Sequence, residues 1–114
     1  MSELTNLFKE VDEVLGRNGK CLSDIRFIMG GGYEISIEDF VRIAAEVNYY
    51  GGYGHQYIPE DMMIVGDDWW LERGEYDGTE WWEFKRLPER PERQRRLARL
   101  DIDRFSDDKY VWEV

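Results

Sequence analysis

The residues with the clearest chemical capacity are carboxylates on a predicted strand. Glu83 and Lys85 are two positions apart, so both lie on one strand face, with Glu72 expected across from them. With Asp67 or Asp68 nearby, two carboxylates could hold Mg²⁺ while the lysine assists an attacking water, as in a metal-dependent nuclease. Such Glu-x-Lys spacing is common by chance, and a polar strand face is its more frequent cause. The nuclease is therefore one alternative among several.

Other catalytic groups are scarce. The chain has one histidine and one cysteine, His55 and Cys21, which are too few for a zinc site. No serine has the neighbours of a nucleophilic triad. Neither glycine cluster is followed by the Lys-Ser or Lys-Thr of a phosphate loop. We therefore expect no metal site and no cofactor, and a binding protein rather than an enzyme.

Aromatic residues give the strongest indication of binding. Tryptophan and tyrosine are enriched at binding hot spots because each combines a large apolar area with a polar group. Four tryptophans lie close together in the sequence, and a loop rich in glycine and tyrosine could stack on a small ligand. The tryptophans are Trp69, Trp70, Trp81 and Trp82, and the candidate ligand loop contains Tyr50, Tyr53 and His55.

Charge is unevenly distributed. The 25 acids and 15 bases give a net charge of −10. Residues 1–84 hold 18 acids and 6 bases (−12), residues 85–100 hold 2 and 7 (+5), and residues 101–114 hold 5 and 2 (−3). An acidic body is repelled by nucleic acid and attracted to basic surfaces. We expect no direct contact with nucleic acid, although solubility alone is a common reason for acidity.

The periodicity of apolar residues predicts a single α+β domain over residues 1–114. A helix is predicted over residues 3–15, where apolar side chains recur at three-and-four spacing. Ser2 is its predicted cap, and Gly16 its predicted end. A second helix follows Ser36. Short strands at 24–29, 33–35 and 62–65 complete a small antiparallel sheet packed by two or three helices.

A tryptophan-rich hairpin is the predicted centre of this sheet. Asp77-Gly78 is a two-residue turn signal, which places Tyr76 opposite Thr79 and fixes the register. Glu72 then lies opposite Glu83, an unfavourable like-charge pair unless a cation engages it. The predicted core face carries Trp69, Leu71, Arg73, Trp82 and Phe84, with Arg73 over Trp82 as a cation–π pair. The other face carries Trp70, Glu72, Tyr76, Trp81, Glu83 and Lys85.

The last part of the chain is basic and then aromatic. Pro88 and Pro91 are expected to open a short arginine-rich helix over residues 91–100, with Leu97 and Leu100 facing inward. Pairing of these arginines with the protein's own acids is favoured over nucleic-acid binding. Residues 110–114 alternate as a last strand.

Sequence features also bear on the compartment. No apolar run approaches the roughly 20 residues that span a bilayer, so no membrane segment is expected. The start of the chain lacks the basic and then apolar pattern of a signal peptide. The single cysteine suits a reducing compartment, which favours the cytoplasm.

Three segments carry a resemblance to known proteins: WLERGEYDGTEWWEFK (70–85), ISIEDF (35–40) and YGGYG (50–54). Over about residues 34–88 the chain resembles small uncharacterised acidic proteins of phages and mobile elements in gut Firmicutes. The resemblance implies a setting in which small acidic proteins block host defence, as anti-CRISPR and anti-restriction proteins do. Several of those imitate the charge of DNA. No functional residue can be carried over.

Three functional hypotheses follow. The first is a non-enzymatic phage-type inhibitor in the bacterial cytoplasm that binds a basic surface of a host nuclease or CRISPR effector. The second is a small-ligand or nucleotide-sequestering protein, and the third is the nuclease. An exposed tryptophan face would also serve a homodimer. The predicted partner-binding residues are Trp70, Glu72, Glu75, Tyr76, Asp77, Glu80, Trp81 and Glu83.

Overall fold

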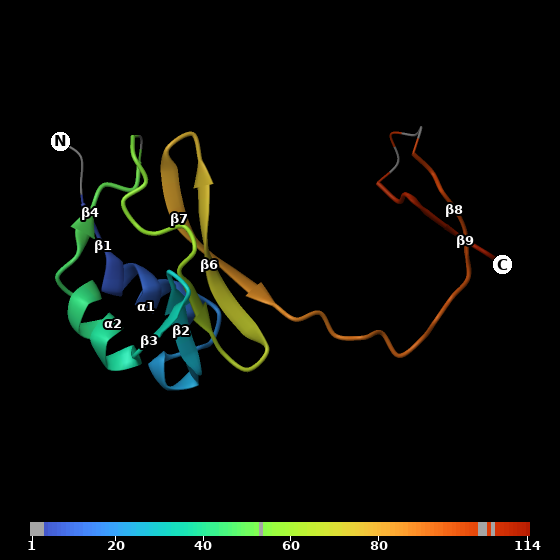
Figure 1. Ribbon diagram of the computed structural model, residues 1–114. Helices are drawn as coiled ribbons and strands as arrows, with labels where there is room; N and C mark the ends of the chain where they lie inside the picture. Colours follow the sequence, from blue (N-terminus) through green and yellow to red (C-terminus); the bar gives the residue numbers. More distant parts are fainter. Residues whose placement is uncertain (1–3, 53, 103–104, 106) are drawn as a thin grey trace.

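The computed structural model, which describes residues 4–52, 54–102, 105 and 107–114, combines two α-helices with a five-stranded antiparallel sheet (Figure 1). The sheet order is β3-β2-β5-β6-β7, and smaller sheets pair β1 with β4 and β8 with β9. The predicted α+β class with a central tryptophan-rich hairpin is confirmed. The single domain over residues 1–114 stays a prediction.

The elements have the following bounds. The helices are α1 (Leu7–Arg17) and α2 (Ile37–Ala44), with a 3₁₀ turn at Leu22–Asp24. The strands are β1 (Thr5–Asn6), β2 (Phe27–Gly30), β3 (Tyr33–Ile35), β4 (Asn48–Tyr49), β5 (Met63–Val65), β6 (Trp69–Tyr76), β7 (Thr79–Arg86), β8 (Leu97–Leu100) and β9 (Tyr110–Trp112). Neither described helix has the length and apolar content to cross a membrane.

The first helix begins later than predicted. Asn6 is its cap, and its side chain accepts a hydrogen bond from the Lys9 N–H at 3.0 Å. Pairing of β1 with β4 holds the preceding residues extended, so the helix cannot start before Asn6. The predicted cap, Ser2, lies outside the described residues. The prediction that Gly16 ends the helix is wrong, because the helix continues to Arg17.

The second helix starts as predicted. The Ser36 hydroxyl accepts a hydrogen bond from the Asp39 N–H at 3.0 Å. Before it, β2 and β3 form the predicted hairpin through the glycine turn, where Gly31 and Gly32 have φ angles of 60° and 83°. Such angles favour glycine, because a β-carbon would clash there.

The central hairpin has the predicted register throughout. Tyr76 pairs with Thr79, and pairing continues without a bulge to Trp69 and Arg86. Asp77 and Gly78 form the turn with φ angles of 52° and 84°, the left-handed conformations that a two-residue hairpin turn requires.

The core lies between this sheet and both helices. Ile28, Ile64 and Leu71 form one row across β2, β5 and β6, and each is 0% exposed. Val11 and Leu15 of α1 cover them from the helix side. Figure 1 shows both helices on the same side of the sheet.

The predicted basic helix at 91–100 is wrong. Residues 97–100 form β8, in which Leu97 and Leu100 lie opposite Trp112 and Tyr110 of β9. A helix of about ten residues is marginal unless an apolar face packs on the body, and here every side chain from 85 to 100 is exposed. Figure 1 shows the β8–β9 hairpin apart from the body, at the end of an extended segment. We call residues 87–114 the C-terminal arm.

Candidate protein-binding face

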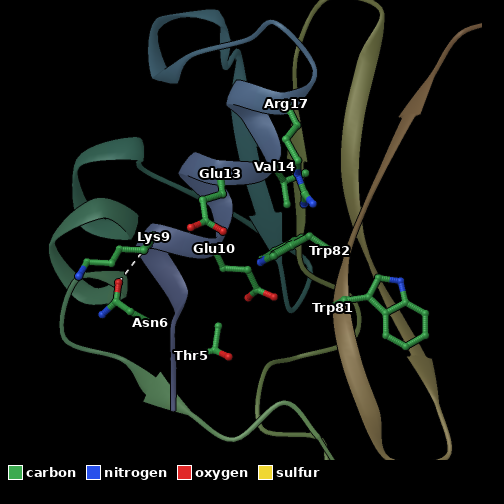
Figure 2. Close-up of a pocket in the computed structure, with 9 residues that line it drawn as sticks. All are labelled: Thr5, Asn6, Lys9, Glu10, Glu13, Val14, Arg17, Trp81 and Trp82. Carbon is green, nitrogen blue, oxygen red and sulfur yellow. Dashed lines mark hydrogen bonds between the residues drawn. The ribbon is translucent and has the colours of Figure 1, made fainter. Parts of the chain in front are cut away.

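One face of the sheet points away from both helices. Side chains alternate along a strand, so the neighbours of each core residue project from the opposite face. Figure 2 shows this at β7, where Trp82 points toward α1 and Trp81 points away from it. We call this surface the open face; it consists of Phe27, Met29, Glu34, Met63, Val65, Trp70, Glu72, Trp81, Glu83 and Lys85.

The open face is unusually apolar for a sheet surface turned toward solvent. An antiparallel sheet covered on one side ordinarily presents polar side chains on the other. Here Phe27 and Met29 are 37% and 38% exposed, and Met63, Val65 and Trp70 are half-buried beside them. Contiguous exposed apolar surface bordered by polar groups is typical of an interaction site.

Two glutamates lie on the β6–β7 side of this surface. Glu72 and Glu83 face each other across β6 and β7, as predicted. The Trp70 indole N–H donates to Glu72 at 2.8 Å, and the Trp81 indole N–H donates to Glu83 at 3.2 Å. Lys85 Nζ lies 3.4 Å from Glu83. These contacts offset the like-charge repulsion and fix the two indole nitrogens beside the carboxylates.

The position of the Trp81 indole requires glycine at the cross-strand position. Gly74 is its partner across the hairpin, and a β-carbon at Gly74 would lie 2.6 Å from the Trp81 indole nitrogen and 2.5 Å from a Glu83 carboxylate oxygen. The indole therefore lies over the bare backbone of Gly74. Large aromatic rings covering a cross-strand glycine in this way shield the backbone and fix the ring.

The predicted binding residues at the turn are accessible. Tyr76 is 77% exposed at the end of β6, and Asp77 is exposed in the turn itself. Glu75 is also exposed, and its carboxylate accepts a hydrogen bond from the Gly78 N–H at 2.8 Å. Tyr76 extends the aromatic character of the open face to the hairpin tip, and Glu75 and Asp77 add negative charge around the turn.

Glu80 was expected on the binding surface but is buried. Its side chain is 0% exposed and forms a 2.8 Å ion pair with Arg73. It also accepts hydrogen bonds from the Tyr57 and Ile58 N–H groups at 2.8 and 3.0 Å. Glu80 points to the core face with Trp82, so it fastens the glycine–tyrosine loop to the sheet and cannot meet a partner.

A buried polar cluster surrounds that ion pair. The Tyr49 hydroxyl donates to Glu10, and Arg73 Nη2 lies 3.3 Å from the same hydroxyl. Burial raises the pKa of Glu10 despite its contacts with Tyr49 and Arg73, and burial with the Glu10 contact raises the pKa of Tyr49. The Arg73 guanidinium stacks over Trp82 at 4.7 Å, as predicted.

Sequence reasoning missed Glu10 and Tyr49 as members of this cluster. A buried arginine requires counter-charges, and that requirement was the available signal. The position of Arg73 on the predicted core face therefore implied acids from other elements. Which acids these are depends on how α1 and β4 pack, which local sequence does not specify.

A groove of about 480 Å³ runs between α1 and β7 (Figure 2). The residues that line it are Thr5, Asn6, Lys9, Glu10, Glu13, Val14, Arg17, Trp81 and Trp82, and among them the Trp81 indole points away from α1. Of the predicted ligand-loop residues that the structure describes, neither Tyr50 nor His55 lines it. Tyr50 is half-buried and His55 is exposed elsewhere, while Tyr53 lies outside the described residues.

The predicted nuclease set is only partly assembled. Glu83, Lys85 and Glu72 share the open face, but Asp67 is engaged by Arg26 at 2.5 Å. Within the described part of the chain, no group of three histidine, cysteine or acidic side chains is arranged to hold a metal ion.

Comparison with known proteins adds no relative. Scans against protein-family models, curated proteins and solved structures each give no match to this chain. The resemblance to small phage proteins therefore stays a prediction, and function must be inferred from the surface chemistry.

Proposed function

We propose that the chain is a non-enzymatic binding protein whose open face docks on a basic protein surface. In the finer form of this proposal it is a phage-type inhibitor of a nucleic-acid-binding defence protein in a bacterial host. The observation that carries the proposal is the uncovered apolar surface of Phe27, Met29, Met63, Val65 and Trp70, with Glu34 on one side of it and Glu72 and Glu83 on the other.

The energetics favour a protein partner. The open face offers rigid anchors, because hydrogen bonds from the indole N–H groups fix Trp70 and Trp81. Rigid tryptophans lose little side-chain entropy on binding, and they dominate measured hot spots. Removing such an anchor typically weakens binding by ~2 kcal/mol or more, roughly thirty-fold.

Charge favours a basic partner. Glu34, Glu72 and Glu83 lie on one row that crosses the sheet, within a body that carries −12 over residues 1–84. An acidic field of this kind accelerates association with basic proteins, and salt weakens it. Binding should therefore be strong at low salt and fall as salt rises.

The test is a pull-down from nuclease-treated bacterial lysate, followed by affinity measurement with the purified partner. Glu34→Lys/Glu72→Lys reverses two charges on the open face and leaves Glu83 intact. Glu38→Lys/Glu46→Lys makes the same change in net charge on and just after α2, where both acids are exposed. We expect binding to fall at least tenfold in the first variant and to change little in the second.

Equal effects of the two double variants would contradict the open face as the site and leave only a general effect of charge. Trp70→Ala provides a second readout that does not alter charge. If it leaves affinity unchanged, the aromatic anchors play no part in binding.

A further inference from the structure

The outer edge of the sheet has a regular pattern of unused backbone groups. β7 is the last strand in the order β3-β2-β5-β6-β7, so one of its sides pairs with β6 and the other pairs with no strand of the described part of the chain. The Glu80 N–H bonds to the Gly51 carbonyl at 2.9 Å and thus points away from β6. Backbone groups alternate along an antiparallel strand. Trp82, Phe84 and Arg86 therefore direct their N–H and C=O groups outward.

This edge has few of the features that normally prevent sheet extension. Natural edges are usually short, bulged or covered. β7 has eight residues and pairs with β6 without a bulge, and among the described residues its outer side bonds to another segment's backbone at Glu80. The groove between α1 and β7 leaves space beside it (Figure 2).

We propose that β7 pairs antiparallel with β7 of a second copy of this chain and joins the two five-stranded sheets across a two-fold axis at Phe84. In this register Glu83 lies opposite the second copy's Lys85, on the open face. Because the axis repeats every contact, Lys85 lies opposite the second copy's Glu83. The sequence of the edge is thus complementary in charge to itself.

Neighbouring registers lack this complementarity. Hydrogen bonds form only where the outward N–H and C=O groups of one strand lie opposite those of the other. The register can therefore change only in steps that move the two-fold axis to the next residue. An axis at Glu83 sets Glu83 against its own copy, and an axis at Lys85 does the same for Lys85. Like charges directly opposite destabilise a strand pair.

The ends of the pairing also fit the chain. With the axis at Phe84, Trp82 lies opposite the second copy's Arg86 at the mouth of the groove, where Glu10 and Glu13 of α1 face it. The next facing pair would be Pro88 and the second copy's Glu80. Pro88 has no N–H, and the Glu80 N–H already donates to the Gly51 carbonyl. Pairing therefore stops after about six backbone hydrogen bonds, two at each facing pair.

Sedimentation of the purified chain tests the proposal without any other partner. We expect the mass to rise from 13.7 kDa toward twice that value with concentration. Glu83→Lys and Lys85→Glu each place like charges opposite and should raise the dimer dissociation constant about ten- to thirty-fold. The double variant Glu83→Lys/Lys85→Glu restores both pairs and should return within about threefold of the original value.

Glu38→Lys is the matched control, since it makes the same charge change at an exposed position of α2, away from β7 and from the open face, and should leave dimerisation unchanged. A mass of 13.7 kDa up to about 1 mM overturns the proposal. So does a dimer in which the double variant shows no recovery. Hydrogen exchange that slows with concentration in β8 instead of at Trp82, Phe84 and Arg86 would assign the contact to the C-terminal arm. All these outcomes are independent of whether the open face binds a basic protein.

Discussion

Replacing Glu80 by alanine tests the buried ion pair that ties the hairpin to the glycine–tyrosine loop. The Glu80 and Arg73 side chains are 0% and 1% exposed, so removing the carboxylate leaves a buried guanidinium without its closest counter-charge. The Tyr57 and Ile58 N–H groups lose their acceptor at the same time. Breaking a buried pair from one side costs about 3–5 kcal/mol. That is a large share of the roughly 5–15 kcal/mol that stabilises a typical domain.

Urea unfolding followed by tryptophan fluorescence measures this loss, and thermal unfolding should show Tm lowered by roughly 10–20 °C. Glu75→Ala is the matched control, because Glu75 lies directly opposite Glu80 on β6 but is exposed. It should cost less than about 1 kcal/mol. The double variant Arg73→Met/Glu80→Leu removes both charges and should recover much of the stability. A loss below about 1 kcal/mol in Glu80→Ala would refute the buried pair.

Three further outcomes are expected. Burial raises the folded-state pKa of Glu10 above the usual 4.5. Its contribution to stability is therefore present at lower pH and is lost as pH rises through that raised pKa. In a pH series of urea unfolding curves, Glu10→Gln should remove this part of the decline in stability. Gly74→Ala should displace the Trp81 indole and cost about 1–3 kcal/mol, with a shift in tryptophan emission. Gly16→Ala meets no atom within 4 Å in α1 and should stabilise the protein by about 0.5–1 kcal/mol by the same unfolding measurement.

The hairpin was predictable because its geometry is local. A two-residue turn fixes the register of every later pair, so the Asp77-Gly78 signal sufficed to place Arg73 over Trp82. The same alternation places Glu80 on the core face. Its charge alone predicts an exposed position, but the need of the buried Arg73 for a counter-ion is the stronger constraint.

The open face could not be predicted as a whole. Its apolar band unites Phe27 and Met29 of β2 with Met63 of β5 and Trp70 of β6, and that neighbourhood depends on the strand order. Strand order is determined by contacts distant in sequence, whereas propensity and periodicity describe only near neighbours. The prediction for the C-terminal arm is wrong for a different reason. Leu97 and Leu100 are three residues apart, which suits a helix, but each lies opposite a residue of β9 in a hairpin.

The tight turn between β6 and β7 also has a consequence for how the chain folds. Contacts across this hairpin join residues close in sequence, whereas β2 meets β5 only after a separation such as that between Phe27 and Val65. Closing the longer loop loses more chain entropy before any contact compensates for it. The hairpin should therefore form early and present the inner side of β6 as a template for β5 and then β2. The β2–β3 hairpin then joins last, and β3, at the edge of the sheet, is the strand most exposed to transient opening.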